Sequence, residues 1–162
     1  MRHLIERVLE LSDEEVVPQL TPQPAGQGTD EELRALLESL QPRIRVYGVG
    51  GAGCNAVGRL ESEGLFENSF VTGYAINTDA QALLMSPLEN KILIGRTARG
   101  RGAGGDPTKG EAAALESEMS LRTITTDTQL AIIAAGMGGG SGTGAAGHIA
   151  RLAKQQGAMT IA

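Results

Sequence analysis

Residues 136–145 read Gly136-Met137-Gly138-Gly139-Gly140-Ser141-Gly142-Thr143-Gly144-Ala145, with six glycines in ten positions. Each glycine costs about 1 kcal/mol of helix or strand stability relative to alanine, so this stretch is predicted to be a loop. The apolar run before it, residues 129–135 (QLAIIAA), predicts a buried strand, and residues 145–157 have helical spacing with a terminal glycine. The loop is therefore expected to join a strand to the N-terminus of a helix.

A junction of this kind binds anions. The first N–H groups of a helix have no partner within the helix, and the helix dipole favours negative charge at that end. Glycines let the backbone approach a phosphate closely, and the hydroxyls of Ser141 and Thr143 add hydrogen-bond donors. A flexible Gly/Ser linker is the alternative, but linkers seldom lie between a strand and an amphipathic helix.

A second glycine-rich stretch, residues 48–64 (GVGGAGCNAVGRLESEG), follows a strand predicted to begin at Arg43. Gly48, Gly50 and Gly53 form G-x-G-x-x-G before a helix that closes at Gly64, the fingerprint of dinucleotide binding. A nicotinamide-dependent oxidoreductase therefore stays an open hypothesis. Such an enzyme needs an acidic residue about 20 positions further on. Asp79, after the predicted strand 70–76, comes late for that role, and the hypothesis leaves residues 136–145 unexplained.

A third glycine-rich stretch, residues 96–107 (RTARGRGAGGDP), follows a predicted strand at 91–95 and carries three arginines, Arg96, Arg99 and Arg101. Asp106 and Pro107 predict the N-cap and first turn of a helix over residues 108–119. The arginines fit either a solvated surface or an anion site. In a doubly wound sheet the loops at the carboxyl ends of the strands meet along one edge. The predicted fold is therefore α/β, a Rossmann-like doubly wound parallel sheet whose fifth strand starts at 158 and whose loops converge on one anion.

Composition excludes several other classes of protein. The chain has 162 residues, with one cysteine, two histidines and 2% aromatic residues. One cysteine cannot form an internal disulfide, the cysteines and histidines are too few for a metal cluster, and the aromatic residues are too few to stack on bases. No apolar run approaches the ~20 residues of a membrane span, and no signal peptide begins the chain. We expect a cytoplasmic protein without membrane insertion and without nucleic-acid binding.

Residues 1–42 are predicted to form an acidic helical extension ahead of a domain at 43–162. They carry nine acidic residues and three arginines. Apolar residues between Leu4 and Leu11 share one helical face, a Pro/Gly/Gln-rich connector follows at 18–28, and Thr29 with Glu32 forms a capping box for a second helix. The leucine stripe of that second helix, residues 33–40, is expected to dock on the domain or on a partner; both options stay open.

Four stretches, in this order and spacing, resemble the nucleotide-binding loops of FtsZ, the tubulin-like cell-division GTPase family: GVGGAGCNAV (48–57), AINTDAQAL (75–83), GRGAGGDP (100–107) and GMGGGSGTGA (136–145). The last is similar to the glycine-rich signature that tubulins and FtsZ share, with Ser141 in place of the usual threonine. The acidic extension is similar to that of archaeal members.

The resemblance implies a site for GTP or GDP whose Mg²⁺ is carried by the nucleotide, with no direct protein ligand to the metal. Gly50 would make the turn after the first strand, and Ala103, Gly104 and Gly105 would face the γ-phosphate. The site residues that the resemblance implies are Gly50, Gly51, Ala52, Gly53, Cys54, Asn55, Asn77, Thr78, Asp79, Ala103, Gly104, Gly105, Gly138, Gly139, Gly140, Ser141, Gly142, Thr143 and Gly144.

The resemblance also implies a GTPase that polymerises head to tail with itself and forms the division ring in cytokinesis. Its location would be the cytoplasm at the mid-cell division site, and membrane-tethering proteins would bind a C-terminal tail. The family's later elements, among them the acidic loop that completes hydrolysis in a neighbouring subunit, would lie beyond Ala162. We therefore expect an N-terminal fragment that is inactive alone and has no catalytic residue of its own. A tubulin-like scaffold or regulator that binds nucleotide without hydrolysis is the alternative.

Overall fold

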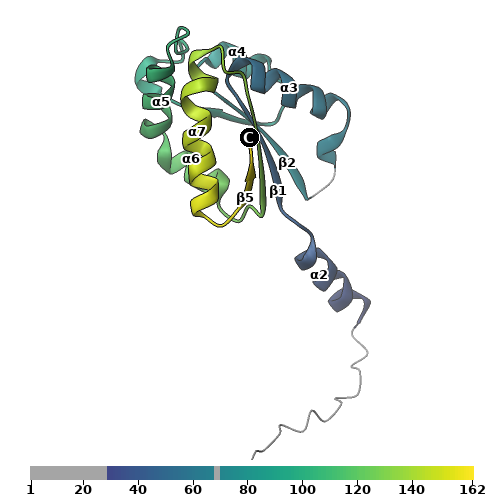
Figure 1. Cartoon of the computed structure of the whole chain (residues 1–162). Coiled ribbons are helices and arrows are strands. Elements are labelled where there is room, and N and C mark those ends of the chain that lie inside the picture. Colours follow the sequence, from purple (N-terminus) through teal and green to yellow (C-terminus); the bar gives the residue numbers. More distant parts are fainter. Residues whose placement is uncertain (1–28, 68–69) are drawn as a thin grey trace, which may run out of the picture. The chain divides into compact units, whose positions relative to one another are not determined.

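The computed structural model describes residues 29–67 and 70–162 of the chain, and its centre is a five-stranded, wholly parallel sheet (Figure 1). The order across the sheet is β3-β2-β1-β4-β5, so the direction of winding reverses between β1 and β4. The doubly wound α/β prediction is confirmed. The strands are β1 (Ile44–Val49), β2 (Val71–Asn77), β3 (Asn90–Leu93), β4 (Leu130–Ala135) and β5 (Met159–Ile161).

Helices cover both faces of this sheet (Figure 1). One face packs against α3 (Gly50–Ser62) and α4 (Ala80–Met85). The other packs against α5 (Pro107–Glu116), α6 (Glu118–Thr125) and α7 (Gly140–Gln155). Two short 3₁₀ turns, η1 (Leu65–Glu67) and η2 (Arg96–Ala98), complete the connections. No helix in the described part of the chain is both long and apolar enough to cross a membrane.

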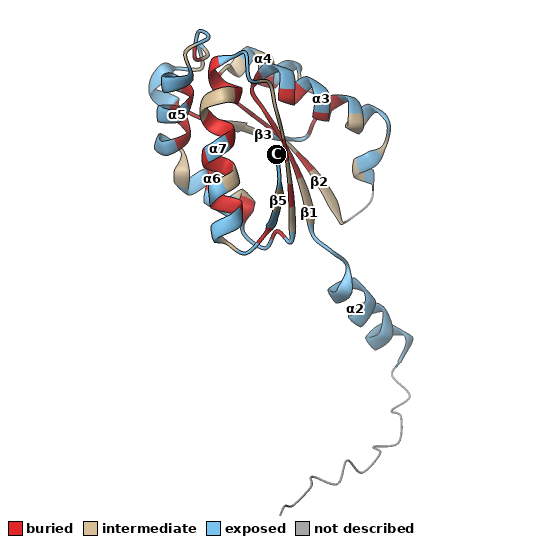
Figure 2. Ribbon diagram, in the orientation of Figure 1, coloured by how far each residue is buried: buried red, intermediate tan, exposed pale blue. Residues whose placement is uncertain are grey.

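The alternation of side chains along the central strands divides the core into two layers. In β1, Val46 packs on the side of α3, whereas Tyr47 and Val49 pack on the side of α7. Figure 2 shows that the buried positions concentrate along the sheet and on the helix faces turned toward it. Both faces are covered, so the central strands are apolar on both sides and read as nearly continuous hydrophobic runs in the sequence.

The prediction that all of residues 136–145 form a loop is wrong. Only Gly136–Gly139 precede the helix, and α7 already begins at Gly140. Close packing explains why a helix tolerates these glycines. A Cβ on Gly144 would lie 2.1 Å from the carbonyl oxygen of Pro107 in α5, and one on Gly142 would lie 2.7 Å from the carbonyl oxygen of Gly136. Glycine in the first turns of α7 thus allows the backbone of this helix to contact the backbone of α5 and that of Gly136.

The helix predicted over residues 108–119 is also different in the structure. It ends at Glu116, and a separate helix, α6, runs from Glu118 to Thr125. Ser117 lies between them, and its hydroxyl accepts a hydrogen bond from the backbone N–H of Gly95 at 2.9 Å. This long-range hydrogen bond accompanies a break that the local pattern of apolar residues does not reveal.

The helix α2 (Asp30–Leu40) confirms the capping box predicted at Thr29. The backbone N–H of Glu32 donates to Oγ1 of Thr29 at 3.3 Å, and the backbone N–H of Thr29 donates to the Glu32 carboxylate at 3.0 Å. The first predicted helix, between Leu4 and Leu11, and the connector at 18–28 lie outside the described residues.

Candidate functional site

A pocket of about 260 Å³ opens where the winding of the sheet reverses, between the segments that follow β1 and β4. This reversal is where doubly wound sheets bind ligands. Two helices begin at the pocket, α3 at Gly50 and α7 at Gly140. Its lining is almost entirely backbone from glycine-rich segments: Val49, Gly50, Gly51, Ala52, Gly136, Gly138, Gly139, Gly140, Ser141 and Gly142.

Glycine is required where the two segments touch. Gly50 has φ +71°, in the left-handed region that disfavours other residues, and a Cβ there would lie 2.7 Å from the backbone nitrogen of Gly142. By contrast, Gly51 and Gly139 have no atom within 4 Å of an added Cβ. The pocket therefore has tight walls at Gly50 and Gly142 and open space beside Gly51 and Gly139.

The segment after β2 is held by its own side chains. The Oδ1 of Asn77, a buried residue, accepts hydrogen bonds from the backbone N–H groups of Thr78 (2.8 Å) and Asp79 (3.3 Å). Asp79 in turn caps α4, because its Oδ1 accepts from Gln81 and Ala82. Both polar side chains thus shape the loop, and Asn77 is not exposed to the pocket.

The segment after β3 pairs with the one after β2. Arg101 forms an antiparallel bridge with Asp79, and the backbone N–H of Gly102 donates to the carbonyl of Thr78 at 3.1 Å. Ala103 is buried against α7, since a Cβ on Gly140 would lie 2.7 Å from the Ala103 Cβ. The four glycine-rich or polar segments predicted to converge therefore do meet at one edge of the sheet.

The three arginines of the segment after β3 do not line the pocket. Arg96, Arg99 and Arg101 are all exposed, and in the described part of the chain none of them forms an ion pair. These side chains therefore do not belong to the pocket at the β1/β4 reversal, and Arg96 and Arg99 line a separate hollow together with Lys91.

Of the predicted site residues, eight line the pocket: Gly50, Gly51, Ala52, Gly138, Gly139, Gly140, Ser141 and Gly142. The other predicted residues do not line the pocket and lie in α3, at the end of β2, in the segments after β2 and β3, or further along α7: Gly53, Cys54, Asn55, Asn77, Thr78, Asp79, Ala103, Gly104, Gly105, Thr143 and Gly144. Gly104 and Gly105 are exposed with φ of +61° and +79°. The hydroxyl of Thr143 is buried without a hydrogen-bond partner among the described residues.

Ala162, beyond which the resemblance places the acidic loop of hydrolysis, directly follows β5 in the chain. It is exposed and does not line the pocket. Ala162 therefore does not line the candidate phosphate site. The acidic loop that the resemblance places after Ala162 stays a prediction.

Cys54 faces the core instead of the pocket. Its Sγ donates to the carbonyl oxygen of Gly48 at 3.3 Å, and burial raises the pKa of the thiol. The thiol therefore stays protonated at neutral pH and cannot approach a ligand in the pocket.

Three residues that shape the site were not among the predicted site residues, although two of them, Val49 and Gly136, lie within the stretches predicted to bind the nucleotide. Val49 and Gly136 line the pocket, and Gly110 of α5 packs against the start of α7, where an added Cβ would lie 2.2 Å from the carbonyl oxygen of Gly140. A glycine inside the alanine-rich helix 107–116 was the available signal, because it lowers helix stability without a local reason.

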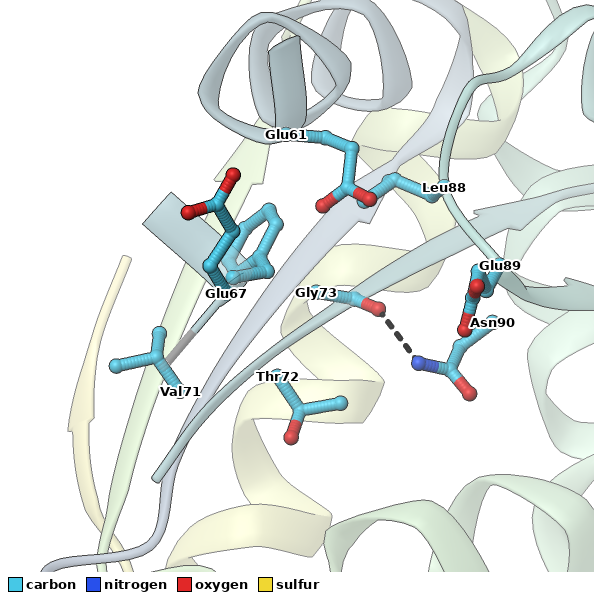
Figure 3. A pocket seen from close by; sticks show the side chains of 9 residues that line it. Glu61, Glu67, Val71, Thr72, Gly73, Leu88, Glu89 and Asn90 are labelled. Atoms are coloured by element: carbon cyan, nitrogen blue, oxygen red, sulfur yellow. Dashed lines mark hydrogen bonds between the residues drawn. The ribbon is translucent and has the colours of Figure 1, made fainter. Parts of the chain in front are cut away.

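A second hollow, of about 340 Å³, lies near the start of β2 (Figure 3). Glu61, Glu67 and Glu89 contribute carboxylates to its lining, and the Asn90 amide donates to the carbonyl of Gly73 at 3.1 Å. Three carboxylates repel a phosphate, so this hollow does not compete with the pocket at the other edge.

Comparison of the sequence and the fold with known proteins identifies the family of the chain. The profile of the Tubulin/FtsZ family, GTPase domain, matches residues 43–162. The chain belongs to the tubulin/FtsZ family. Cell division protein FtsZ 1 of Pyrococcus abyssi is 46% identical over 163 residues, which cover 99% of this chain and 43% of the relative. The FtsZ 1 of Halobacterium salinarum is 44% identical over 140 residues, or 86% of this chain and 35% of the relative.

Among solved structures, the empty FtsZ dimer of M. jannaschii superposes with a TM-score of 0.71 at 43% identity and covers 80% of this chain and 37% of that one. CetZ2 from Haloferax volcanii, solved as a GTPγS-bound protofilament, has a TM-score of 0.64 at 28% identity and covers 73% of this chain and 38% of that one. The chain thus spans less than half the length of these tubulin/FtsZ relatives.

Proposed function

We propose that residues 43–162 bind the phosphates of GTP or GDP in the pocket at the β1/β4 reversal. The observation that carries the proposal is the meeting of two helix N-termini, those of α3 and α7, in a lining made of backbone and small side chains. Each helix start presents N–H groups without helical partners and the positive end of a dipole. Among the described residues that line the pocket, none carries an acidic side chain that would repel a phosphate.

We expect the nucleotide to bring its own cation into this pocket. Its lining holds no lysine or arginine, and no cluster of three His, Cys, Asp or Glu suited to a metal occurs among the described residues. Backbone N–H groups near Gly51 and Gly140–Gly142 would hold the phosphates, and Ala103, Gly104 and Gly105 would lie toward the γ-phosphate. Mg²⁺ would supply the remaining neutralisation of phosphate charge. Specificity for guanine is proposed on the strength of family membership.

We further propose that the whole protein is a GTP-hydrolysing, self-polymerising cell-division protein that acts at the division site in the cytoplasm. Support comes from relatives named cell division protein FtsZ 1 and from a solved FtsZ dimer. Head-to-tail self-association would bring a neighbour's carboxylates to the nucleotide, and tethering proteins would link the filament to the membrane. Because Asp79 is engaged in capping α4 and no carboxylate lines the pocket among the described residues, residues 1–162 alone should bind nucleotide without turnover.

The division of the chain into an extension, residues 1–42, and a nucleotide-binding part, residues 43–162, belongs to the same proposal. It is supported by the range of the family match and by the compact unit formed by residues 41–162.

Gly51→Asp tests the site. The space beside Gly51 is open, and the dipole of α3 favours an acidic residue in the first turn of this helix. The variant should therefore keep the fold, with unchanged or slightly higher stability. A carboxylate about 5 Å from a phosphate opposes binding by roughly 3 kcal/mol at an effective dielectric constant of 20. We expect GTP affinity, measured by titration calorimetry, to fall about 100-fold.

The matched control is Gly147→Asp, in open space on α7 away from the pocket, which should bind GTP like the unaltered chain. Equal affinity in Gly51→Asp and the unaltered chain would contradict this placement of the phosphates. Titration with ATP and NADH separates the alternatives, because NADH binding with indifference to GTP would favour an oxidoreductase. A whole protein that binds GTP without releasing phosphate would favour the scaffold.

A further inference from the structure

One buried hydrogen bond joins two of the segments that meet at the pocket. Oγ1 of Thr78, just after β2, lies 2.6 Å from Oγ of Ser141, the second residue of α7. Thr78 is 1% exposed and Ser141 8% exposed. The two residues are 63 positions apart, so this contact is a tertiary one.

Thr78 also contacts the segment after β3. Its carbonyl accepts the hydrogen bond from the backbone N–H of Gly102 at 3.1 Å, while its own N–H donates to Oδ1 of Asn77. One residue therefore holds its own loop through its N–H, the segment 101–106 through its carbonyl, and the start of α7 through its hydroxyl. Only the last of these contacts depends on the side chain of Thr78.

We propose that Thr78 is a positioning residue that sets the N-terminal turn of α7 relative to segment 101–106. This inference rests on the proposed phosphate site, because Ser141 lines that pocket and Thr78 does not. The hydroxyl of Thr78 is engaged by Ser141 and shielded from solvent, so it acts on the ligand through α7 and not by direct contact. The side chain and the carbonyl of Thr78 thus link the position of Ser141 to that of Gly102.

A double-mutant cycle tests the proposal. Thr78→Val and Ser141→Ala each remove one hydroxyl at nearly constant shape and leave the other buried without its partner. Each should weaken GTP binding by up to about tenfold, because the hydrogen bond contributes roughly 1 kcal/mol to holding the start of α7 in place, and without it part of that cost falls on ligand binding. The double variant should be no weaker than the singles, whereas independent roles would give about 100-fold. Thr78→Ser keeps the hydroxyl and should restore the affinity.

Thr125→Val is the matched control for losing a buried threonine hydroxyl. Thr125 is fully buried, but its Oγ1 donates to the carbonyl of Leu121 within α6, far from the pocket lining. It should lower the melting temperature and leave GTP affinity unchanged. If Thr78→Val behaves in the same way, Thr78 has a structural role only and the proposal is overturned, as it is by additive losses in the cycle.

Amide exchange of the nucleotide-free chain, followed by NMR, gives a readout that does not need GTP. Ser141→Ala should speed exchange of the Gly102 amide, although Ser141 has no hydrogen bond to Gly102. Exchange that changes only in the segment carrying the substitution would overturn the proposal. If the unaltered chain fails to bind GTP, the proposed function falls, and the exchange result still decides whether Thr78 links the two segments.

Discussion

Replacing Gly144 by alanine should destabilise the fold, although alanine is the better helix former. The added Cβ would lie 2.1 Å from the carbonyl oxygen of Pro107, 2.5 Å from the nitrogen of Glu111 and 2.9 Å from the carbonyl carbon of Gly110. All three atoms are backbone of α5, so no side chain can rotate away. The helix α5 would have to move by roughly 1 Å to restore normal contact distances.

The size of the effect follows from two opposing contributions. Overpacking of this kind costs about 1–3 kcal/mol, and a rigid backbone neighbour favours the upper end, while the higher helix propensity of alanine returns about 1 kcal/mol. The free energy of unfolding should therefore fall by about 2 kcal/mol. Gly147→Ala, three residues further along α7 with no atom within 4 Å of the new Cβ, should raise it by about 0.5–1 kcal/mol.

Urea unfolding followed by circular dichroism measures both variants. We expect the midpoint to fall for Gly144→Ala and to rise for Gly147→Ala, with the slope unchanged in both. The corresponding melting temperatures should shift by about 2–4 °C per kcal/mol. A gain in stability for Gly144→Ala equal to that for Gly147→Ala would show that α5 and α7 are not in close backbone contact, and would refute the packing argument for the glycines of α7.

Three further outcomes follow from individual contacts. Cys54 should react with a thiol reagent only slowly in the folded chain, because the thiol is buried and its pKa is raised, and saturating GTP should not slow the reaction further. Fast labelling that GTP slows would place the thiol in the pocket. Asp106 has a lowered pKa, chiefly through the hydrogen bond from the Thr108 hydroxyl, so its contribution to stability is present above about pH 4 and is lost as the pH falls through the folded-state pKa. The stability difference between the unaltered chain and Asp106→Asn should therefore shrink below pH 4, which acid titration of the unfolding midpoint checks. Ser117→Ala should lower stability by about 1–2 kcal/mol, because the Gly95 N–H loses its acceptor; no change in the midpoint would show that water replaces the hydroxyl.

The parts of the fold that depend on local pattern were predictable. The largely apolar strands β1 and β4 each follow a polar residue and end just before a glycine, and the capping box at Thr29 needs only residues three apart. The convergence of the glycine-rich segments was also predictable, because parallel strands place their carboxyl ends at one edge. The predicted helix boundaries near Gly140 and Ser117 were wrong, because contacts between distant segments outweigh local helix propensity there.

The sequence by itself determined the parallel α/β sheet, the positions of its glycine-rich segments and the resemblance to the tubulin/FtsZ family. All three depend on patterns and motifs of residues that are close together in the chain. Only the tertiary structure decided which of those residues face the pocket. Cys54 and Gly51 come from the same stretch, yet one side-chain position points into the core and the other into open space. Likewise, Gly142 and Gly144 have the same local signal but touch different backbones. These assignments depend on how α3, α5 and α7 pack, and the spacing of residues along the chain does not contain that information.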